Sequence, residues 1–323
     1  MQLSDIQRFI KPEWDEFLSF YRQQLRSPVP EMDLVTEYVY EQKGKQLRPL
    51  LIFLCAKLNG AITRRTQVGA TTVELFHVGT LLHDDVIDEA AERRGMPTVN
   101  VRWQSKIAVL VGDCLFIRGA ALAIENEAYD FLQILAKSTQ EIGEGELMQM
   151  QKSQDLDTDE AFYIEIIRRK TASLLQACTH IGALSANATD EQVATMKSFG
   201  NLLGIAFQMR DDVLDYQSAM FTGKNEGNDI REKKLTLPLI FALQQVDKKQ
   251  QKHILNLLVD AKQKQKNVKA IMDFVKQQGG IRYAEEKTLW YAAQAKALLD
   301  IYPASETKEC LTALIDYVVL RKK

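Results

Sequence analysis

The amino-acid sequence predicts an all-α protein that folds as one domain over residues 1–323. Three observations support this prediction. Glycine and proline are scarce, at 16 and 7 of 323 residues. The alternation of apolar and polar residues that is typical of strands is nearly absent, whereas apolar residues recur at spacings of three and four. No linker rich in Pro, Ser or Gly divides the chain, so we expect a single domain.

Breakers and apolar spacing predict the individual helices. Gly44 ends one helix, and Pro49 suits the first turn of the next, which ends at Gly60. The segment that follows carries a stripe of apolar and small residues at helical spacing: Val68, Thr72, Leu75, Gly79, Leu82 and Val86. The polar, glycine-containing stretch 217–234 is predicted to be a loop. Helices are expected over about 32–42, 49–59, 65–92, 108–126, 131–151, 159–186 and 190–216, and again from about 237 onward.

Composition and charge limit which classes of partner and which cellular location we expect for this protein. The formal net charge of -2 gives no general reason to expect nucleic acid or an anionic membrane as partner. The four cysteines form no CxxC pair, which argues against a zinc site or a disulfide framework and fits a reducing cytosol. The first residues, MQLSDIQRFIKPEW, lack the features of a signal or transit peptide. No apolar run approaches the roughly 20 residues of a bilayer span. We therefore expect a cytoplasmic protein without a membrane span.

Two acidic clusters, DDVID at 84–88 and DDVLD at 211–215, lie within apolar helical sequence. Asp84 and Asp88 are four residues apart and share one helix face, and the same holds for Asp211 and Asp215. Like charges at this spacing destabilise a helix, so a cation must compensate them. Mg²⁺ prefers hard oxygen ligands and is commonly shared between carboxylates and substrate phosphates. A solvated or N-capping acidic face is the alternative, and it is less able to explain two matching clusters.

Basic side chains accompany the acidic clusters at helix ends and loops. Arginine offers phosphate a bidentate fork and lysine a point charge, although each such residue taken alone is more often a solvated surface charge. His77 lies seven residues before Asp84 and therefore on nearly the same helix face. A lone histidine in an apolar helix is usually a core residue, which is the alternative for His77. The candidate basic residues are Lys45, Arg48, Arg93, Arg94, Lys170, Lys224 and Lys234.

Six segments, taken in order, resemble the motif blocks of the all-E (trans) polyprenyl diphosphate synthases. They are GKQLRP, ELFHVGTLLHDDVIDEAAERRGMPTVN, GEGELMQM, the pair Lys170-Thr171, FQMRDDVLD and GKNEGNDIREKKLTLP. The resemblance covers nearly the whole chain and is most evident to bacterial long-chain members such as the octaprenyl diphosphate synthases. One departure is visible at Lys233, where the family usually has glycine.

The resemblance implies an all-α single-domain bundle around a deep central cavity, usually a homodimer. It implies that the enzyme condenses isopentenyl diphosphate with an allylic diphosphate and releases a lipid product. Mg²⁺, as three ions with substrate bound, would be held by Asp84, Asp88 and Asp211, supported by Asp85, Asp212 and Asp215. The allylic diphosphate would contact Arg93, Lys170, Thr171, Gln208, Lys224 and Lys234. Isopentenyl diphosphate would contact Lys45, Arg48, His77 and Arg94. The basic tail Arg321-Lys322-Lys323 resembles a family tail that approaches the site.

Three residues that precede the first acidic cluster, Phe76, Gly79 and Thr80, are expected to influence the length of the product. On a helix, Phe76, Thr80 and Asp84 form one row, with about 6 Å between successive members. Short-chain members of the family place bulky aromatics just before the motif, whereas this chain has Gly79 and Thr80. A product near octaprenyl is therefore expected, with a farnesyl or geranylgeranyl product as the alternative. Phe76 either closes the tail path lower down or packs in the core.

The remaining predictions concern the reaction and its alternatives. We expect loop 217–234, with Gly223 and Gly227 as hinges, to exclude water, and the departing pyrophosphate to accept the proton that is lost. An HD-type phosphohydrolase would need a further histidine well upstream of His83 and leaves the second cluster unexplained. A terpene cyclase has no use for Lys45, Arg48 and Arg94. A non-catalytic partner subunit would be expected to lose its acidic clusters, and this chain keeps both.

Overall fold

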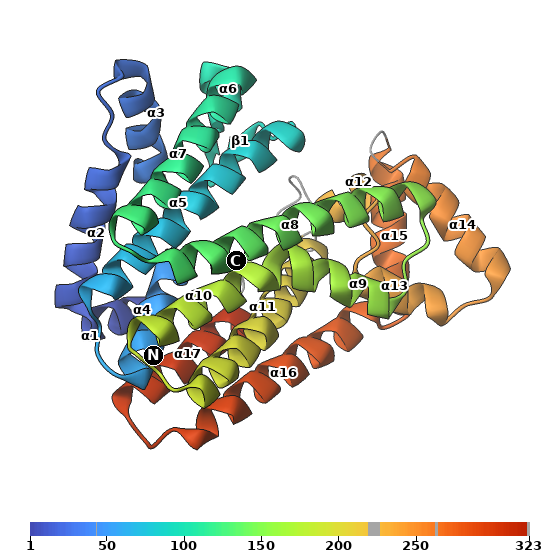
Figure 1. Ribbon diagram of the computed structural model, residues 1–323. Helices are drawn as coiled ribbons and strands as arrows, with labels where there is room; N and C mark the ends of the chain where they lie inside the picture. Colours follow the sequence, from blue (N-terminus) through green and yellow to red (C-terminus); the bar gives the residue numbers. More distant parts are fainter. Residues whose placement is uncertain (43, 219–226, 262–263, 322–323) are drawn as a thin grey trace. The chain divides into compact units, whose positions relative to one another are not determined.

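The computed structural model describes residues 1–42, 44–218, 227–261 and 264–321 (Figure 1). Regular structure in these residues is almost entirely helical, which confirms the all-α prediction. The longer helices are α2 (Lys11–Leu25), α3 (Pro30–Glu41), α4 (Leu47–Asn59), α5 (Arg64–Ile87), α7 (Ser105–Glu125), α8 (Tyr129–Asp155), α10 (Ser173–Ser185), α11 (Asp190–Ser218), α14 (Lys248–Val259), α15 (Gln265–Gln277), α16 (Gly280–Leu298) and α17 (Glu306–Leu320). The shorter elements are α1 (Leu3–Phe9), β1 (Glu92–Arg93), β2 (Met96–Pro97), α6 (Val99–Trp103), α9 (Glu160–Ile167), η1 (Arg168–Ala172), α12 (Asn228–Arg231), α13 (Leu237–Gln244) and η2 (Leu299–Ile301).

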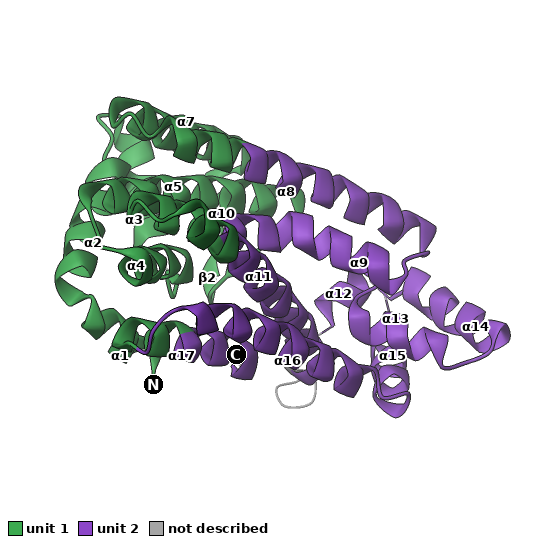
Figure 2. Cartoon of the chain, turned by 60° about the horizontal axis from the view of Figure 1, so that its bottom comes forward, with its two compact units in different colours: residues 1–136, 178–196, 305–311 green, residues 137–177, 197–304, 312–323 purple. Residues whose placement is uncertain are grey.

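The chain divides into two compact units, each made of three chain segments (Figure 2). Unit 1 comprises residues 1–136, 178–196 and 305–311, and unit 2 comprises residues 137–177, 197–304 and 312 onward. Because the segments of the two units alternate along the chain, no single cut in the sequence separates them. The assignment of 1–323 to one domain stays a prediction.

Helix α5 forms the centre of unit 1. Its first turn is capped by Thr63, whose side chain accepts a hydrogen bond from the backbone N–H of Thr66 and completes a capping box. Most of its side chains from Thr66 to Leu82 are buried, because α2, α4 and α7 all pack against it (Figure 1). A ring cluster of Trp14 and Phe17 from α2 with Phe53 from α4 extends this core. The stripe found in the sequence is thus one side of an almost fully buried helix.

The core of unit 2 lies where α9, α11 and α13 meet the C-terminal helices. Its buried side chains include Tyr163, Ile167, Met209, Val213, Tyr216, Ile230, Leu237, Ile271 and Ala284. Helix α11 passes close to the segment Arg168–Ala172, since a Cβ added at Gly204 would lie 2.4 Å from the Cα of Ala172. Such an approach of two backbones is open only to glycine.

Two predicted helices differ from the observed ones. The segment predicted to be helical as far as residue 92 ends at Ile87, and a hairpin of β1 and β2 follows. Strands of two residues are too short to show alternation, so apolar spacing could not predict them. The segment 159–186, predicted to be one helix, contains a π-helical turn at Arg168–Ala172 between α9 and α10. Such a turn accommodates one extra residue without changing the apolar spacing much.

The structure contains helices in two regions where the sequence predicts none: the N-terminal residues and the loop 217–234. Helices α1 and α2 precede the first helix that the sequence predicts. Within the predicted loop 217–234, residues 219–226, and with them Gly223 and Lys224, lie outside the described residues. The described part of that loop contains the short helix α12, which begins after Gly227 with φ +69°. Helices resume at Leu237, as the sequence predicts.

Helix α7 qualifies the expectation that no apolar run approaches the length of a membrane span. Among the described helices it alone is long and apolar enough to cross a bilayer by length and composition, and 39% of its most apolar 18 residues are buried. Its buried side packs against α5. The core helices of many proteins pass the same criterion, so this is weak evidence for a span.

We predict that Gly204→Ala destabilises the protein by about 1–3 kcal/mol, because the new methyl group must displace the backbone at Ala172. Urea denaturation followed by circular dichroism measures the change. Gly143→Ala is the matched control: it also lies within a helix, but an added Cβ meets no atom within 4 Å. That control should be neutral or more stable by up to about 1 kcal/mol. Equal effects of the two substitutions would contradict the close approach at Gly204.

Candidate active site

The first acidic cluster lies at the C-terminal end of α5. Asp88 closes the helix, and its backbone N–H donates to the carbonyl oxygen of Asp84 at 2.8 Å. A helix end of this kind carries partial negative charge, so carboxylates there are unfavourable without a nearby cation. The side chain of Asp84 is partly exposed and that of Asp88 is exposed. This end of α5 therefore presents the hard oxygen atoms that a divalent cation prefers.

Asp85, the middle carboxylate, points away from solvent. It is only 4% exposed, and its Oδ1 lies 2.8 Å from both Nε and Nη2 of Arg93. Its backbone carbonyl accepts a hydrogen bond from the N–H of Ala90 at 2.9 Å. Asp85 therefore fastens the β1–β2 hairpin to the end of α5. Its predicted role in supporting metal stays a prediction, with one oxygen already engaged by Arg93.

The hairpin orients two neighbouring guanidinium groups. Its loop is Arg94-Gly95, with φ of 56° and 76°, the signs that a type I′ turn requires at both central positions. Glycine adopts this conformation without strain, whereas Arg94 does so at a cost. Nη1 of Arg94 donates to the backbone carbonyl of Gln42, at the end of α3. The sequence RRG thus directs Arg93 to the acidic cluster and Arg94 to the segment between α3 and α4.

A pocket in unit 1 gathers several of the predicted substrate-binding residues. It is lined by Gln42, Gly44, Glu74, His77, Arg93 and Arg94, among others. Beside it, Nη1 of Arg48 lies 2.9 Å from Nε2 of His77. Burial, and then the charges of Arg48, Arg94 and Arg93, lower the pKa of His77 well below its ordinary value. His77 is therefore neutral and accepts the hydrogen bond from Arg48. Lys45 is exposed on the segment that leads into α4.

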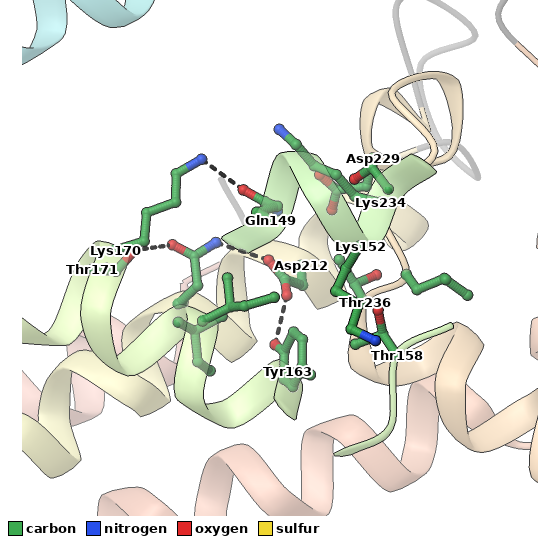
Figure 3. A pocket seen from close by; sticks show the side chains of 15 residues that line it. Gln149, Lys152, Thr158, Tyr163, Lys170, Thr171, Asp212, Asp229, Lys234 and Thr236 are labelled. Atoms are coloured by element: carbon green, nitrogen blue, oxygen red, sulfur yellow. Dashed lines mark hydrogen bonds between the residues drawn. The ribbon is translucent and has the colours of Figure 1, made fainter. Parts of the chain in front are cut away.

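In the second cluster, Asp212 is the buried member. Its Oδ2 accepts a hydrogen bond from the hydroxyl of Tyr163 at 2.6 Å, and its Oδ1 accepts one from Nε2 of Gln208 at 2.8 Å (Figure 3). Burial raises the pKa of Asp212 to about 6, against the lowering effect of these two hydrogen bonds. Both oxygens are thus engaged by protein donors. Its predicted role in supporting metal is untested, and these contacts fit an orienting role as well.

The other two aspartates of this cluster have different partners. Oδ1 of Asp211 lies 2.6 Å from Nη2 of Arg321, near the C-terminus. The carboxylate of Asp215 accepts hydrogen bonds from the backbone N–H groups of Asn228 and Asp229 at 3.1 and 3.2 Å. Asp215 therefore holds the start of α12 against α11. The predicted tail contact is present at Arg321, whereas Lys322 and Lys323 lie outside the described residues.

The π-helical turn positions Lys170 and Thr171. Nζ of Lys170 donates to Oε1 of Gln149 at 2.8 Å and also forms an ion pair with Glu146. The hydroxyl of Thr171 donates to Oε1 of Gln208 at 2.7 Å, so Thr171, Gln208 and Asp212 are linked in series (Figure 3). π-helical turns interrupt regular helices and are frequent at functional sites. The observed turn is a structural reason to place Lys170 and Thr171 at the site.

A second pocket, in unit 2, is lined by these residues and by the segment after α12. Lys170, Thr171, Gln208, Asp212, Asp229 and Lys234 are among its lining residues. Lys234 forms an ion pair with Glu232. Burial, followed by the charges of Asp212 and Asp215, raises the pKa of Asp229 well above its ordinary value. Lys233 has φ of 58°, a conformation that favours glycine, which accounts for the family's preference at this position.

The described residues fit divalent cations that are shared with a substrate. Within the described ranges, no group of three or more His, Cys, Asp or Glu side chains is arranged to hold a metal by itself. Asp84 with Asp88 in unit 1, and Asp211 with Asp215 in unit 2, each supply carboxylates one helical turn apart. Mg²⁺ commonly takes one or two carboxylates and completes its six ligands with water and phosphate oxygens. The donor set therefore suits Mg²⁺ bound together with a diphosphate.

The three residues predicted to set product length do not share one environment. Gly79 packs against α7, where an added Cβ would lie 3.1 Å from the carbonyl oxygen of Gly112 and 3.2 Å from the ring of Phe116. Phe76 meets the same ring edge-on, at 5.4 Å between centroids. Packing between α5 and α7 therefore explains why Gly79 and Phe76 occupy these positions. Thr80 remains partly exposed, and its hydroxyl donates to the backbone carbonyl of His77 at 2.7 Å.

Sequence reasoning missed Tyr163, Glu74, Gln149 and Asp229 as residues of the two pockets. Helical spacing could have found two of them. Tyr163 precedes Lys170 by seven residues, and Glu74 precedes His77 by three, so each shares a helix face with a residue already singled out. Gln149 lies within the motif block GEGELMQM and Asp229 within GKNEGNDIREKKLTLP, so the resemblance of these blocks to the family was the signal that could have found them.

The helical fold, together with two pockets that are each lined by both acidic and basic side chains, defines a class of helical enzymes that act on isoprenoid diphosphates. The family model described as polyprenyl synthetase matches residues 29–275, and the chain belongs to this family of prenyltransferases. This confirms the resemblance seen in the sequence.

Individual relatives support the same assignment. The chain is 33% identical to octaprenyl diphosphate synthase of Haemophilus influenzae over 97% of this chain and 95% of the relative. It is 31% identical to a short chain isoprenyl diphosphate synthase of Methanothermobacter thermautotrophicus, over 100% and 99%. Among solved structures, decaprenyl diphosphate synthase from Rhodobacter capsulatus superposes with a TM-score of 0.94 at 34% identity, covering all of both chains. Polyprenyl synthase from Caulobacter crescentus, complexed with calcium and isoprenyl diphosphate, gives 0.93 at 33%, covering 100% of this chain and 98% of that one.

We predict that Tyr163→Phe destabilises the protein by about 1–3 kcal/mol at pH 8, because it leaves an oxygen of buried, ionised Asp212 without its donor. The pKa of Asp212 is about 6 and lies above its unfolded value, so its carboxyl is largely protonated in the native state at pH 5. The loss should therefore be smaller at pH 5 than at pH 8, as measured by urea denaturation at both values.

Tyr283→Phe is the control for this prediction. The hydroxyl of Tyr283 donates to Glu160 at 2.7 Å, but that tyrosine is partly exposed, so its loss should be smaller. A loss for Tyr163→Phe that is the same at both pH values would contradict the role of its hydroxyl in stabilising ionised Asp212.

Proposed function

We propose that this protein condenses isopentenyl diphosphate with an allylic diphosphate, with Mg²⁺, to give an all-trans polyprenyl diphosphate near octaprenyl in length. One observation carries the proposal: one aspartate of each acidic cluster lines a pocket together with basic side chains. In unit 1, Asp85 lies beside Arg93 and Arg94. In unit 2, Asp212 lies beside Lys170 and Lys234. The other aspartates of each cluster, which can hold Mg²⁺, adjoin these residues in the sequence. Together with cations that can hold phosphate oxygens, they form the donor set a diphosphate requires.

The two pockets suit different substrates. We assign isopentenyl diphosphate to unit 1, with Arg48, Arg94 and His77 near its phosphates and Lys45 at the entrance. We assign the allylic diphosphate to unit 2, with Lys170, Thr171, Gln208 and Lys234 as contacts and Lys224 as a further contact outside the described residues. Arg93 is predicted to contact the allylic diphosphate. It lines the unit 1 pocket beside Arg94 and forms an ion pair with Asp85.

The proposed metal sites use the carboxylates of each cluster that are at least partly exposed. Asp84, Asp88, Asp211 and Asp215 would hold Mg²⁺, three ions when substrates are bound. Bound Mg²⁺ supplies charge neutralisation for the departing diphosphate. The calcium and isoprenyl diphosphate in the relative from Caulobacter crescentus support the pairing of divalent cations with this kind of ligand.

The chemistry needs positioning and charge compensation more than an acid or a base. The bond between the allylic carbon and the diphosphate oxygen breaks, and both electrons leave with the diphosphate. Lys170 and Lys234 can stabilise the negative charge that develops on this leaving group. The double bond of isopentenyl diphosphate then attacks the allylic cation, and one proton is lost to the departing pyrophosphate. Arg48 and Arg94 would hold the second diphosphate, which makes the attack effectively intramolecular.

A homodimer and a cytoplasmic location complete the proposal. On α7, Leu110, Ile117 and Ile124 are exposed at seven-residue spacing and so lie on one helix face, with Ile117 70% exposed. Such an apolar stripe is unfavourable in water and suits a second copy of the chain. The cysteines Cys55, Cys114, Cys178 and Cys310 are all free thiols, which fits a reducing compartment.

We predict that Asp84→Asn and Asp211→Asn each lower turnover at least about a hundredfold, because each removes a carboxylate that would hold the Mg²⁺ needed to neutralise the departing diphosphate. The measurement is incorporation of radiolabelled isopentenyl diphosphate into extractable lipid with an allylic primer and Mg²⁺. Circular dichroism should show unchanged helical content. Glu191→Gln, an exposed carboxylate on α11, is the control and should keep full activity. Activity retained by either aspartate variant at limiting Mg²⁺ would exclude the metal-binding role.

We predict that Thr80→Tyr shortens the product, because the added ring fills the row that runs from Asp84 toward Phe76, about 6 Å per step. Chromatographic sizing of the radiolabelled product measures the effect, and Thr80→Ser should leave the length unchanged. Gly79→Tyr is a poorer test, since its side chain meets α7. An unchanged product length in Thr80→Tyr would contradict the proposed path of the growing chain.

A further inference from the structure

Glu74 is a buried acid inside the pocket that we assign to a diphosphate. It lies in the middle of α5, is 7% exposed, and lines the unit 1 pocket together with Gln42, His77 and Arg94. Its Oε2 is buried, and among the described residues it has no hydrogen-bond partner. A negative charge at this place repels the anion that the pocket is proposed to bind.

Asp85 and Asp212, two other carboxylates that line the pockets, have protein partners. Asp85 is paired with Arg93, and Asp212 accepts hydrogen bonds on both oxygens. A buried carboxylate oxygen without a donor costs free energy in the ionised state, which a purely structural acid would avoid. The negative charge of the Glu74 carboxylate is therefore only partly compensated by the surrounding protein.

The compensation that Glu74 does have comes from the same cations that would bind phosphate. Burial raises the pKa of Glu74 to about 7, while the charges of Arg48 and Arg94 lower it. Conversely, the charge of Glu74 is one of the influences that raise the pKa of Arg94, against the larger effect of burial. In the empty pocket, Glu74 thus offsets part of the repulsion among Arg48, Arg93 and Arg94.

We propose that Glu74 is a positioning residue that carries the counter-charge for Arg48 and Arg94 in the empty pocket and takes up a proton from solvent when a diphosphate binds. This inference rests on the proposed function of the unit 1 pocket. A bound diphosphate withdraws the two guanidinium charges from Glu74 and adds negative charge beside it, and both effects favour the neutral carboxyl. Protonation of Glu74 on binding would therefore remove the repulsion between its carboxylate and the bound diphosphate.

Two other titratable groups near Glu74 cannot take up this proton near pH 8, because they already carry one. Tyr21 of α2 is buried with a pKa raised well above its ordinary value, and burial raises the pKa of the Cys178 thiol to about 12, so both stay neutral. His77 on the same helix is neutral, with a pKa lowered well below its ordinary value, and is a competing acceptor. Among the described residues, Tyr40 of α3, Asp85 of α5, Arg93 and Arg94 also line the pocket, and the charge of Arg48 acts on Glu74.

The sign of the pH dependence follows from these groups. Above pH 7 the free protein holds Glu74 ionised, and the complex holds it protonated, so binding takes up a proton and weakens as the pH rises. The fall is at most tenfold per pH unit, up to the pKa of Glu74 in the complex. Isopentenyl diphosphate is itself fully ionised at pH 8, because the last phosphate pKa is about 6.

The test is isothermal titration calorimetry of isopentenyl diphosphate with the full chain at pH 8, without metal or allylic substrate. Titrations in two buffers of different ionisation enthalpy give the number of protons taken up. We expect wild-type protein to take up most of one proton, and Glu74→Gln to take up almost none and to bind about tenfold more tightly at pH 8. Glu41→Gln, an exposed acid at the end of α3, is the control and should match wild type.

The outcomes separate this inference from the proposed function. Binding by wild-type protein without proton uptake would overturn the role of Glu74, and this measurement does not depend on any variant folding. Uptake that persists in Glu74→Gln would transfer the proton to His77 and also overturn the inference. Weaker binding by Glu74→Gln at every pH would indicate that the carboxylate has only a structural role. No binding of isopentenyl diphosphate at any pH would overturn the proposed function, and the inference with it.

Discussion

A carboxylate that leaves water needs a cation or a hydrogen-bond donor, and both pockets of this protein are organised by that requirement. The chain places acids on apolar helices, α5 and α11, where the surrounding core cannot solvate them. Each acid then fixes another element. Asp85 holds the β1–β2 hairpin, Asp212 holds Tyr163 and Gln208, and Asp215 holds the start of α12. The acidic clusters therefore build the pockets as well as offering oxygen atoms to metal.

This arrangement divides the aspartates of each cluster by depth. The buried members, Asp85 and Asp212, are engaged by protein groups, and Asp84 and Asp88 at the end of α5 are open to solvent to differing degrees. The division follows from helical geometry, because a residue next to another in sequence points about 100° away around the axis. A DDxxD pattern thus combines outward ligands with an inward anchor in five residues. Asp211 is partly exposed and is held by Arg321, which adds the end of the chain to the same network.

The sequence predicted the helices and the main residues of the site, because apolar spacing and charged motifs are local signals. Residues 65–87 show the stripe that buries α5, and the order of the motif blocks is legible without a structure. What it did not predict depends on contacts between distant segments. The contact of Arg94 with Gln42, the approach of Gly79 to Phe116 and the pairing of Tyr163 with Asp212 each require a partner far away in the chain. The conformation of Lys233 is local, but only its backbone angle reveals why glycine suits that place.

The π-helical turn at Arg168–Ala172 makes the length of this segment part of its function. Each residue of an α-helix advances the chain by about 100° around the axis, so one residue removed here would restore a regular helix and rotate α9 relative to α10 by that angle. Tyr163 and Gln149 could then no longer meet Asp212 and Lys170 together. Substitutions in this turn change single side chains, whereas a one-residue deletion would misalign two groups of contacts at once. Natural variation among relatives should therefore conserve the residue count of this segment more strictly than its composition.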